Sequence, residues 1–122
     1  MARLKILPLQ NVRELKEECV FCNECLCFDR DDRIFSQIKN YQNRDNPTVK
    51  VQPIPRGMWI ETYRGSGIER SRNDECEEEL TFAYAKELKK LKMLKDTSPR
   101  NMAIKAFINA LPDDVPIFLD WW

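Results

Sequence analysis

The sequence predicts a small α+β domain whose N-terminal unit is stapled by a bound metal ion. Three observations support this fold class: a dense cluster of cysteines near the N-terminus, strand-like runs in the middle of the chain, and two helical patterns in the last third. A chain of 122 residues is long enough for one core of ordinary size. We therefore expect a single domain, 1–122, made of a cysteine-rich unit (1–46), a central β-hairpin (47–70) and a C-terminal αα-hairpin with an aromatic tail (71–122).

The first unit contains three predicted elements besides its cysteines. Apolar residues between positions 4 and 9 predict a short edge strand that ends at Pro8. A brief helical turn is expected over residues 10–15. Asp31 and Asp32 are suitable N-cap residues for a following helix. The apolar residues of that helix recur at spacings of three and four: Ile34, Phe35, Ile38 and Tyr41.

The cysteines predict a metal site. Four of the five lie within nine residues, and a C-x₂-C step places two thiolates, which are ligands preferred by Zn²⁺, on one tight turn. Either all four clustered thiols bind one ion, or three of them join the distant fifth cysteine, which is geometrically easier. The candidate ligands are Cys19, Cys22, Cys25, Cys27 and Cys76.

Structural zinc is the favoured interpretation of this spacing, and an iron–sulfur cluster is the alternative. The run C-x₂-C-x₂-C with a distant fourth cysteine resembles the ligand pattern of a cubane cluster. Ferredoxins continue with a nearby fourth cysteine followed by proline, which this chain lacks. Free or disulfide-linked cysteines are the third interpretation.

The middle of the chain predicts a β-hairpin. Residues 48–52 and 58–63 favour an extended backbone, and residues 53–57 contain the prolines and the glycine of a turn. The face that carries the aromatic residues is interpreted first as core. The alternative is a surface that stacks nucleic-acid bases while cations contact phosphates, formed by Arg56, Trp59, Tyr63 and Arg64.

Two helices are predicted in the last third. Asp74 lies three residues before Glu77, which is the spacing of an N-terminal cap, and apolar residues then recur at helical spacing to Leu94. Ser98 and Pro99 predict the N-cap and first turn of a second helix, which we expect to run to about Leu111.

The second helix is apolar around most of its circumference, and the tail after it ends in two tryptophans. One partner helix cannot cover so broad a surface, so the excess must meet the rest of the domain or another protein. For the tail, folding back into the core is the favoured interpretation, and docking into a partner is the alternative. The candidate partner-binding residues are Phe107, Ile108, Leu111, Phe118, Trp121 and Trp122.

These features favour a non-enzymatic adaptor or regulatory protein that acts through protein contacts. The alternatives are a nucleic-acid-binding protein and an iron–sulfur redox or sensor protein. The chain has no histidine and no glycine-rich phosphate loop, and its twenty basic residues balance twenty acidic ones. Transcription or chromatin accessory subunits and viral accessory proteins include compact metal-bound adaptors of this kind. We expect another protein as partner, with nucleic acid or a second copy joined through the C-terminal helices as alternatives. No run is long enough to span a membrane, so the expected location is intracellular, cytoplasmic or nuclear.

Overall fold

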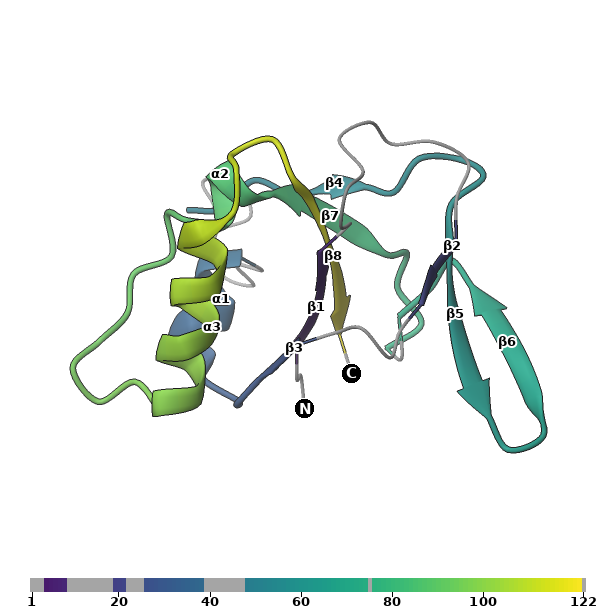
Figure 1. Cartoon of the computed structure of the whole chain (residues 1–122), viewed down its shortest axis with the longest axis horizontal. Coiled ribbons are helices and arrows are strands. Elements are labelled where there is room, and N and C mark those ends of the chain that lie inside the picture. The colour runs from purple at the N-terminus through teal and green to yellow at the C-terminus, as the bar shows by residue number, and fades with distance from the viewer. Residues whose placement is uncertain (1–3, 9–18, 22–25, 39–47, 75, 122) are drawn as a thin grey trace.

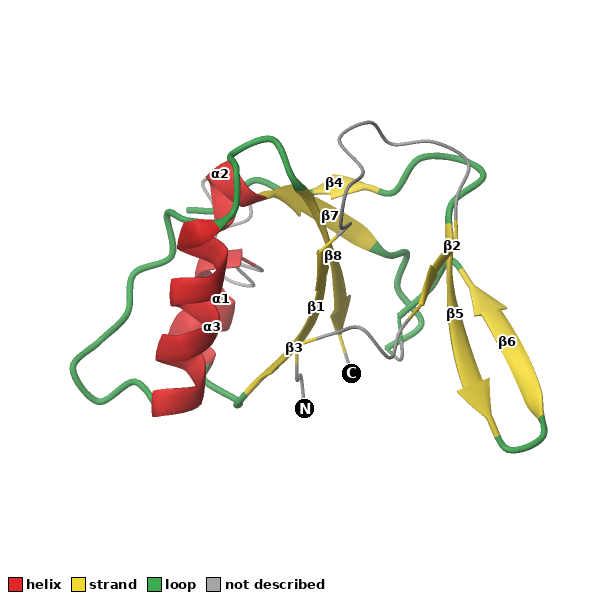
Figure 2. Cartoon of the chain, in the orientation of Figure 1, coloured by secondary structure: helices red, strands yellow, loops and turns green. Residues whose placement is uncertain are grey.

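The described residues form three layers: helices, a five-stranded sheet and a three-stranded sheet (Figure 1). This computed structural model describes residues 4–8, 19–21, 26–38, 48–74 and 76–121. Figure 2 shows the helices on one side of the larger sheet and the smaller sheet on its other side. The predicted α+β class is therefore confirmed.

The five-stranded sheet has the order β3-β1-β8-β7-β4, and each neighbouring pair is antiparallel. Its strands are β1 (Leu4–Pro8), β3 (Leu26–Phe28), β4 (Gln52–Pro53), β7 (Thr81–Tyr84) and β8 (Pro116–Trp121). The predicted first strand exists, but it lies inside the sheet between β3 and β8 and is not an edge strand. The aromatic tail supplies the central strand, β8.

The three-stranded sheet has the order β2-β5-β6 and contains the hairpin that extends from the rest of the domain (Figure 1). β5 (Trp59–Arg64) and β6 (Gly67–Ser71) are antiparallel, whereas β2 (Cys19–Phe21) runs parallel to β5. The tight turn between β5 and β6 contains Gly65 at a φ of +56°, a conformation that glycine adopts without a steric penalty.

The helices are α1 (Asp32–Ile38), α2 (Ala85–Leu88) and α3 (Pro99–Ala110). The predicted cap of α1 is confirmed, because the Asp31 carboxylate accepts the backbone N–H of Arg33 at 3.0 Å. Of the apolar residues expected on α1, three are buried and Tyr41 lies outside the described residues. The helical turn expected over residues 10–15 also lies outside them.

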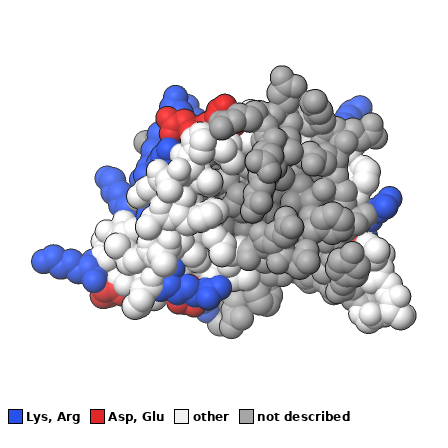
Figure 3. Space-filling view, in the orientation of Figure 1, with Lys and Arg blue, Asp and Glu red and all other residues white. Residues whose placement is uncertain are grey.

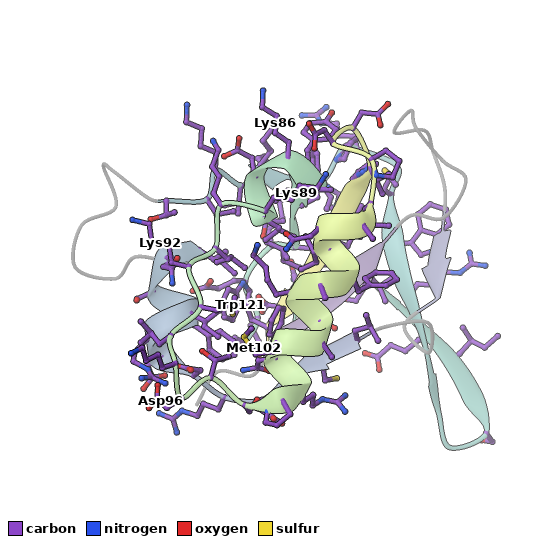
Figure 4. All side chains as sticks on the ribbon, turned by 60° about the vertical axis from the view of Figure 1, so that its left-hand side comes forward. Lys86, Lys89, Lys92, Asp96, Met102 and Trp121 are labelled. Atoms are coloured by element: carbon purple, nitrogen blue, oxygen red, sulfur yellow. The ribbon has the colours of Figure 1, made fainter. Side chains whose placement is uncertain are left out.

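Side chains of β8 point alternately into two clusters of buried residues, one on each face of the five-stranded sheet. Ile117, Leu119 and Trp121 belong to the cluster under the helices, whereas Phe118 packs against the smaller sheet. Phe35 of α1 meets Trp121 edge to face, with ring centroids 5.3 Å apart. Figure 4 shows Trp121 between the ribbons of α1 and α3.

The expected helical hairpin is wrong in its first half. The expected cap at Asp74 is not a helix cap: its carboxylate accepts the N–H groups of Cys76 at 2.9 Å and Glu78 at 3.0 Å within a loop. Glu77 has a φ of +63°, which is incompatible with a continuing helix. The chain then forms β7 and the four-residue α2, so the helical hairpin is absent from the described part of this segment.

The central hairpin is also built differently from the prediction. The strand predicted over residues 58–63 is present as β5, but its hairpin partner is β6 and not the segment 48–52. From that segment, only Gln52 joins a strand, the two-residue β4, which contains Pro53 and lies at the edge of the other sheet, where a residue without an N–H is tolerated.

Candidate protein-binding surface

The position of α3 is fixed by hydrogen bonds at its N-terminus. The Ser98 hydroxyl caps the helix by accepting the N–H of Asn101 at 3.2 Å, and Pro99 occupies the first turn. The buried Asn101 side chain accepts the N–H of Asp29 at 2.8 Å and donates to the Asp29 carbonyl at 3.0 Å. These bonds hold α3 to the segment that follows β3, and they confirm the predicted second helix.

One side of α3 is buried and the opposite side is exposed. Asn101, Ile104 and Ile108 face the core. The residues on the opposite side form what we call the outer face of α3, and Met102 and Phe107 are 46% and 39% exposed there. The full set is Met102, Ala103, Ala106, Phe107 and Ala110. Figure 3 shows an area without charged groups over α3.

The outer face has small residues at its centre and large ones at its margins. At 100° per residue, Ala103, Ala106 and Ala110 lie along the middle of this side, with Met102 on one flank and Phe107 on the other. The short alanine side chains allow another backbone to approach closely, and the flanking side chains supply apolar area. This shape suits a second helix.

Charged residues lie at the two ends of the outer face. Arg100 is at the N-terminal end of α3, and its guanidinium donates to the carbonyl of Cys27 at 2.6 Å. Asp113 and Asp114 are exposed in the turn that follows the C-terminal end. Lys89 donates to Asp113 at 2.6 Å, and this bond lowers the pKa of the Asp113 carboxyl. The face therefore has Arg100 at one end and, at the other, the Lys89–Asp113 ion pair beside Asp114.

Lysines border α3 on one side. Figure 4 shows Lys86, Lys89 and Lys92 along α2 and the connection after it, with Met102 on α3 itself. Lys105 is half-buried and donates to the Lys89 carbonyl at 3.0 Å, and burial together with the nearby Lys89 charge lowers the pKa of Lys105. The outer face consequently has a charged margin beside an uncharged centre.

The predicted partner-binding residues do not form one surface. Ile108 and Phe118 are completely buried, Trp121 is 5% exposed, and Leu111 is half-buried, so the domain itself covers these side chains. Trp122 lies outside the described residues. Phe107 alone among the described members of that set is exposed. Met102 and the alanines belong to the broad apolar surface expected on the second helix but are not among the candidate partner-binding residues, although their helical spacing places them on the same side as Phe107.

The structure does not test the predicted metal site. Cys19 lies in β2 and Cys27 in β3, which belong to different sheets, while Cys76 is exposed in the loop before β7. Cys22 and Cys25 lie outside the described residues. Within the described ranges, no three metal-ligating side chains come together. Zinc, with an iron–sulfur cluster as the alternative, therefore stays a prediction.

The candidate nucleic-acid residues are only partly described. The Trp59 ring is half-buried, and the guanidinium of Arg70 lies 5.3 Å from its centroid. Arg56 is exposed in the turn before β5. The side chains of Tyr63 and Arg64 lie outside the described part of the structure. Because a cation already occupies one face of Trp59, at most one face of this ring is open to a base.

A polar cleft of about 450 Å³ lies between the start of α1 and the start of α3. Arg33 pairs with Asp31 on its own side of the cleft at 3.0 Å and with Asp96 across the cleft at 2.8 Å. The hydrogen bond from Arg33 lowers the pKa of the Asp31 carboxyl. The Arg33–Asp96 pair links α1 to the connection before α3, which gives the cleft a structural role.

No family model, no curated protein and no solved structure matches this chain. In the part of the chain that the structure describes, no helix is both long and apolar enough to cross a membrane. The structural class of the protein is thus described by its own features: it is a small three-layer α+β domain with an exposed apolar face on α3.

Proposed function

We propose that the protein is a non-enzymatic adaptor or regulator that binds another protein through the outer face of α3. The observation that supports this proposal is the exposure of Met102 and Phe107 on either side of the three alanines of the outer face. Large contiguous apolar patches are uncommon on monomeric proteins and often mark interaction sites. The same helix contributes Ile104 and Ile108 to the core, so its outer face is presented on a fixed support.

The shape of this face favours a helical partner. Two helices pack closely where small side chains lie at the crossing point, and large flanking residues then fill the grooves beside it. Ala106 marks this crossing point, with Met102 and Phe107 beside it. An amphipathic helix with apolar residues at spacings of three and four is the partner that this arrangement fits.

Zinc is part of the proposal as a structural element. β2 and β3 belong to different sheets, so the chain passes from one sheet to the other between Phe21 and Leu26. Cys19 and Cys27 lie in the two strands that flank this passage, where a metal ion would fasten the sheets together. Metal analysis of anaerobically purified protein should find about one zinc per chain. Iron with sulfide would support the alternative, and absence of metal would contradict both.

Affinity capture with matched variants tests the protein-binding proposal. Ala106→Glu places a charge at the centre of the outer face and keeps a good helix former. Ile68→Glu places the same charge on β6, where the wild-type side chain is 55% exposed. Proteins captured from a cell extract by the wild type should be retained by Ile68→Glu and lost by Ala106→Glu. Equal capture by all three proteins would contradict a binding role for this face. Circular dichroism checks that both variants are folded.

A further inference from the structure

We propose that a pocket beside α2 binds a phosphate monoester attached to an aromatic ring. The pocket has a volume of about 490 Å³, which is typical of small-molecule sites. Residues near β4, the end of β7, the start of α2 and the turn between α3 and β8 line it. Figure 1 shows α2, β4 and this turn at the same end of the molecule. None of the lining residues belongs to the outer face of α3, so this inference is independent of the proposed function.

Hydrogen bonds hold the walls of the pocket in place. The backbone N–H of Lys86 donates to the carbonyl of Asp113 at 3.1 Å, which joins α2 to the turn after α3. The backbone N–H of Lys50 donates to the Glu87 carboxylate at 3.1 Å, which joins the segment before β4 to α2. β4 itself is paired with β7. The walls therefore have a fixed arrangement before a ligand binds.

The carboxylates of the pocket are already engaged. Glu87 pairs with Lys90 at 2.9 Å and Asp113 pairs with Lys89 at 2.6 Å, and these two lysines are not among the lining residues. The hydrogen bonds from the lysines lower the pKa of both carboxyls, so the pairs stay ionised at neutral pH. The third carboxylate, Asp114, has an interaction of its own. A paired carboxylate repels an incoming anion less than a free one, because the adjacent cation offsets its charge.

The two lysines that line the pocket are available to a ligand. Lys50 and Lys86 are exposed, and neither ammonium group donates a hydrogen bond within the described part of the chain. Their charges act on Glu87 and Asp113 from a distance, as the smaller causes of the low pKa of those carboxyls. A phosphate monoester carries a charge of roughly −2 at neutral pH, which matches two ammonium groups better than a carboxylate does.

An aromatic ring on the ligand suits the side chain of Tyr84. The Tyr84 ring is half-buried and packs against the cluster between the two sheets, where it meets Phe82 edge to face with ring centroids 5.5 Å apart. It is therefore held in a fixed orientation while it lines the pocket. Aromatic rings prefer stacked or edge-to-face contacts with one another. The methylene chains of Lys50 and Lys86 add apolar area around such a ring.

Titration of the ¹⁵N-labelled full chain with phenyl phosphate, followed by NMR, tests the inference. The dissociation constant should be on the order of 1 mM for so small a ligand, with the largest shift changes at Gln52, Tyr84 and Glu87. Inorganic phosphate and phenol each carry one part of the ligand and should bind roughly tenfold more weakly. Equal binding of inorganic phosphate would show an adventitious ion only and would overturn the inference, as would the absence of shift changes.

Substitutions locate the bound phosphate and the bound ring. Lys50→Gln and Lys86→Gln should each weaken the binding of phenyl phosphate by roughly fivefold, whereas the control Lys92→Gln, an exposed position outside the pocket, should leave it unchanged. Tyr84→Leu should remove the preference for phenyl phosphate over inorganic phosphate. An equal loss in Lys92→Gln would assign binding to general positive charge and would overturn the site. The NMR spectrum of each variant shows whether it is folded.

The same ligand chemistry occurs in free small molecules and in the phosphotyrosine side chain of another protein. A short peptide with one phosphotyrosine between glycines distinguishes these sources. Binding of the peptide at least as tight as that of phenyl phosphate would assign the site to a phosphorylated protein segment. Binding of phenyl phosphate alone would assign it to a free small molecule. Either result supports a site for an aromatic phosphate, and failure of both ligands to bind would overturn it.

Discussion

β8 and β6 are strands of similar length with opposite surroundings. Every residue of β8 is buried, whereas four of the five residues of β6 are exposed. β8 lies in the centre of the middle layer, with the helices on one face and the smaller sheet on the other. β6 lies at the edge of an outer sheet and carries Glu69 and Arg70. Because β8 lies in the middle layer and β6 at an outer edge, we expect the stability of the fold to depend on β8 much more than on β6.

The comparison also shows two ways of using polar residues. On the edge strand, charged side chains oppose pairing with another chain, as is usual for an exposed edge. In the interior, polar side chains are retained where they fasten one layer to the next, as Asn101 does between α3 and the end of β3. Substitutions in each region should therefore differ in both size and kind.

Phe118→Ala should have the largest effect. Its ring is completely buried between the two sheets, and removing it leaves a cavity, so the free energy of unfolding should fall by about 3–5 kcal/mol. Ile68→Ala on β6 is the matched control and should change this free energy by less than about 0.5 kcal/mol. Urea denaturation measures both. Comparable losses would mean that β6 is also part of the core.

Asn101→Ala should come next, with a loss of about 2 kcal/mol. The substitution leaves the N–H and carbonyl of Asp29 without their buried partner and keeps the helix former alanine in α3. Asn109→Ala, at an exposed position of the same helix, should cost much less. Thermal denaturation of the two variants compares them directly. Equal effects would show that the Asn101 bonds add little to stability.

Arg72→Met should loosen the smaller sheet by about 1 kcal/mol. The Arg72 guanidinium donates to the carbonyls of Ile54 at 3.2 Å, Pro55 at 2.9 Å and Met58 at 2.7 Å, which lie in the connection that leads into β5. Water replaces part of these bonds because the side chain is partly exposed. Hydrogen exchange should become faster in β5 and β6 and stay unchanged in β8. Faster exchange in all three strands would contradict separate anchoring of the hairpin.

Asp31→Asn should have the smallest effect, and that effect should depend on pH. Asparagine still caps α1, but the ion pair with Arg33 is lost. Because the bond from Arg33 lowers the pKa of Asp31 below 3.8 in the folded state, the carboxylate stabilises the fold above that pH. This contribution disappears as the pH falls through the lower folded-state pKa.

At neutral pH, the free energy of unfolding of the wild type should therefore exceed that of Asp31→Asn by about 0.5 kcal/mol. The difference is small because Arg33 is half exposed and solvent partly screens the ion pair. The two unfolding free energies should converge in acid. Denaturant unfolding at a series of pH values measures the difference. If the difference in unfolding free energy is the same at all pH values, it arises from the helix cap and not from the charge of Asp31.

Sequence signals predicted the elements whose determinants are local. The caps at Asp31 and Ser98 mark real helices, and β5 lies where its aromatic and β-branched residues indicated. The helix predicted over residues 74–95 is wrong for a reason that involves distant parts of the chain. Thr81–Tyr84 pairs with β8 more than thirty residues later, and no local pattern reveals that pairing.

The sequence predicted the candidate surface only in part, because the side of α3 that is exposed also depends on long-range packing. The breadth of the apolar surface on α3 is visible in the sequence, but the side that faces inward depends on the position of the five-stranded sheet. Phe107 and Ile108 are both candidate partner-binding residues in the sequence, but only Phe107 is exposed, and Ile108, its neighbour, is buried. To decide which of two adjacent helix residues is exposed, one must know which side of the helix packs against the sheet.

The central position of β8 also has a consequence for biosynthesis. β8 pairs with β1 on one side, from Leu4–Trp121 to Pro8–Ile117, so the two strands are separated by about a hundred residues of chain. While the ribosome is still making residues 116–121, β1 and β7 lack the strand that joins them. Until residues 116–121 emerge, the edges of β1 and β7 that pair with β8 stay open, and unpaired strand edges favour aggregation.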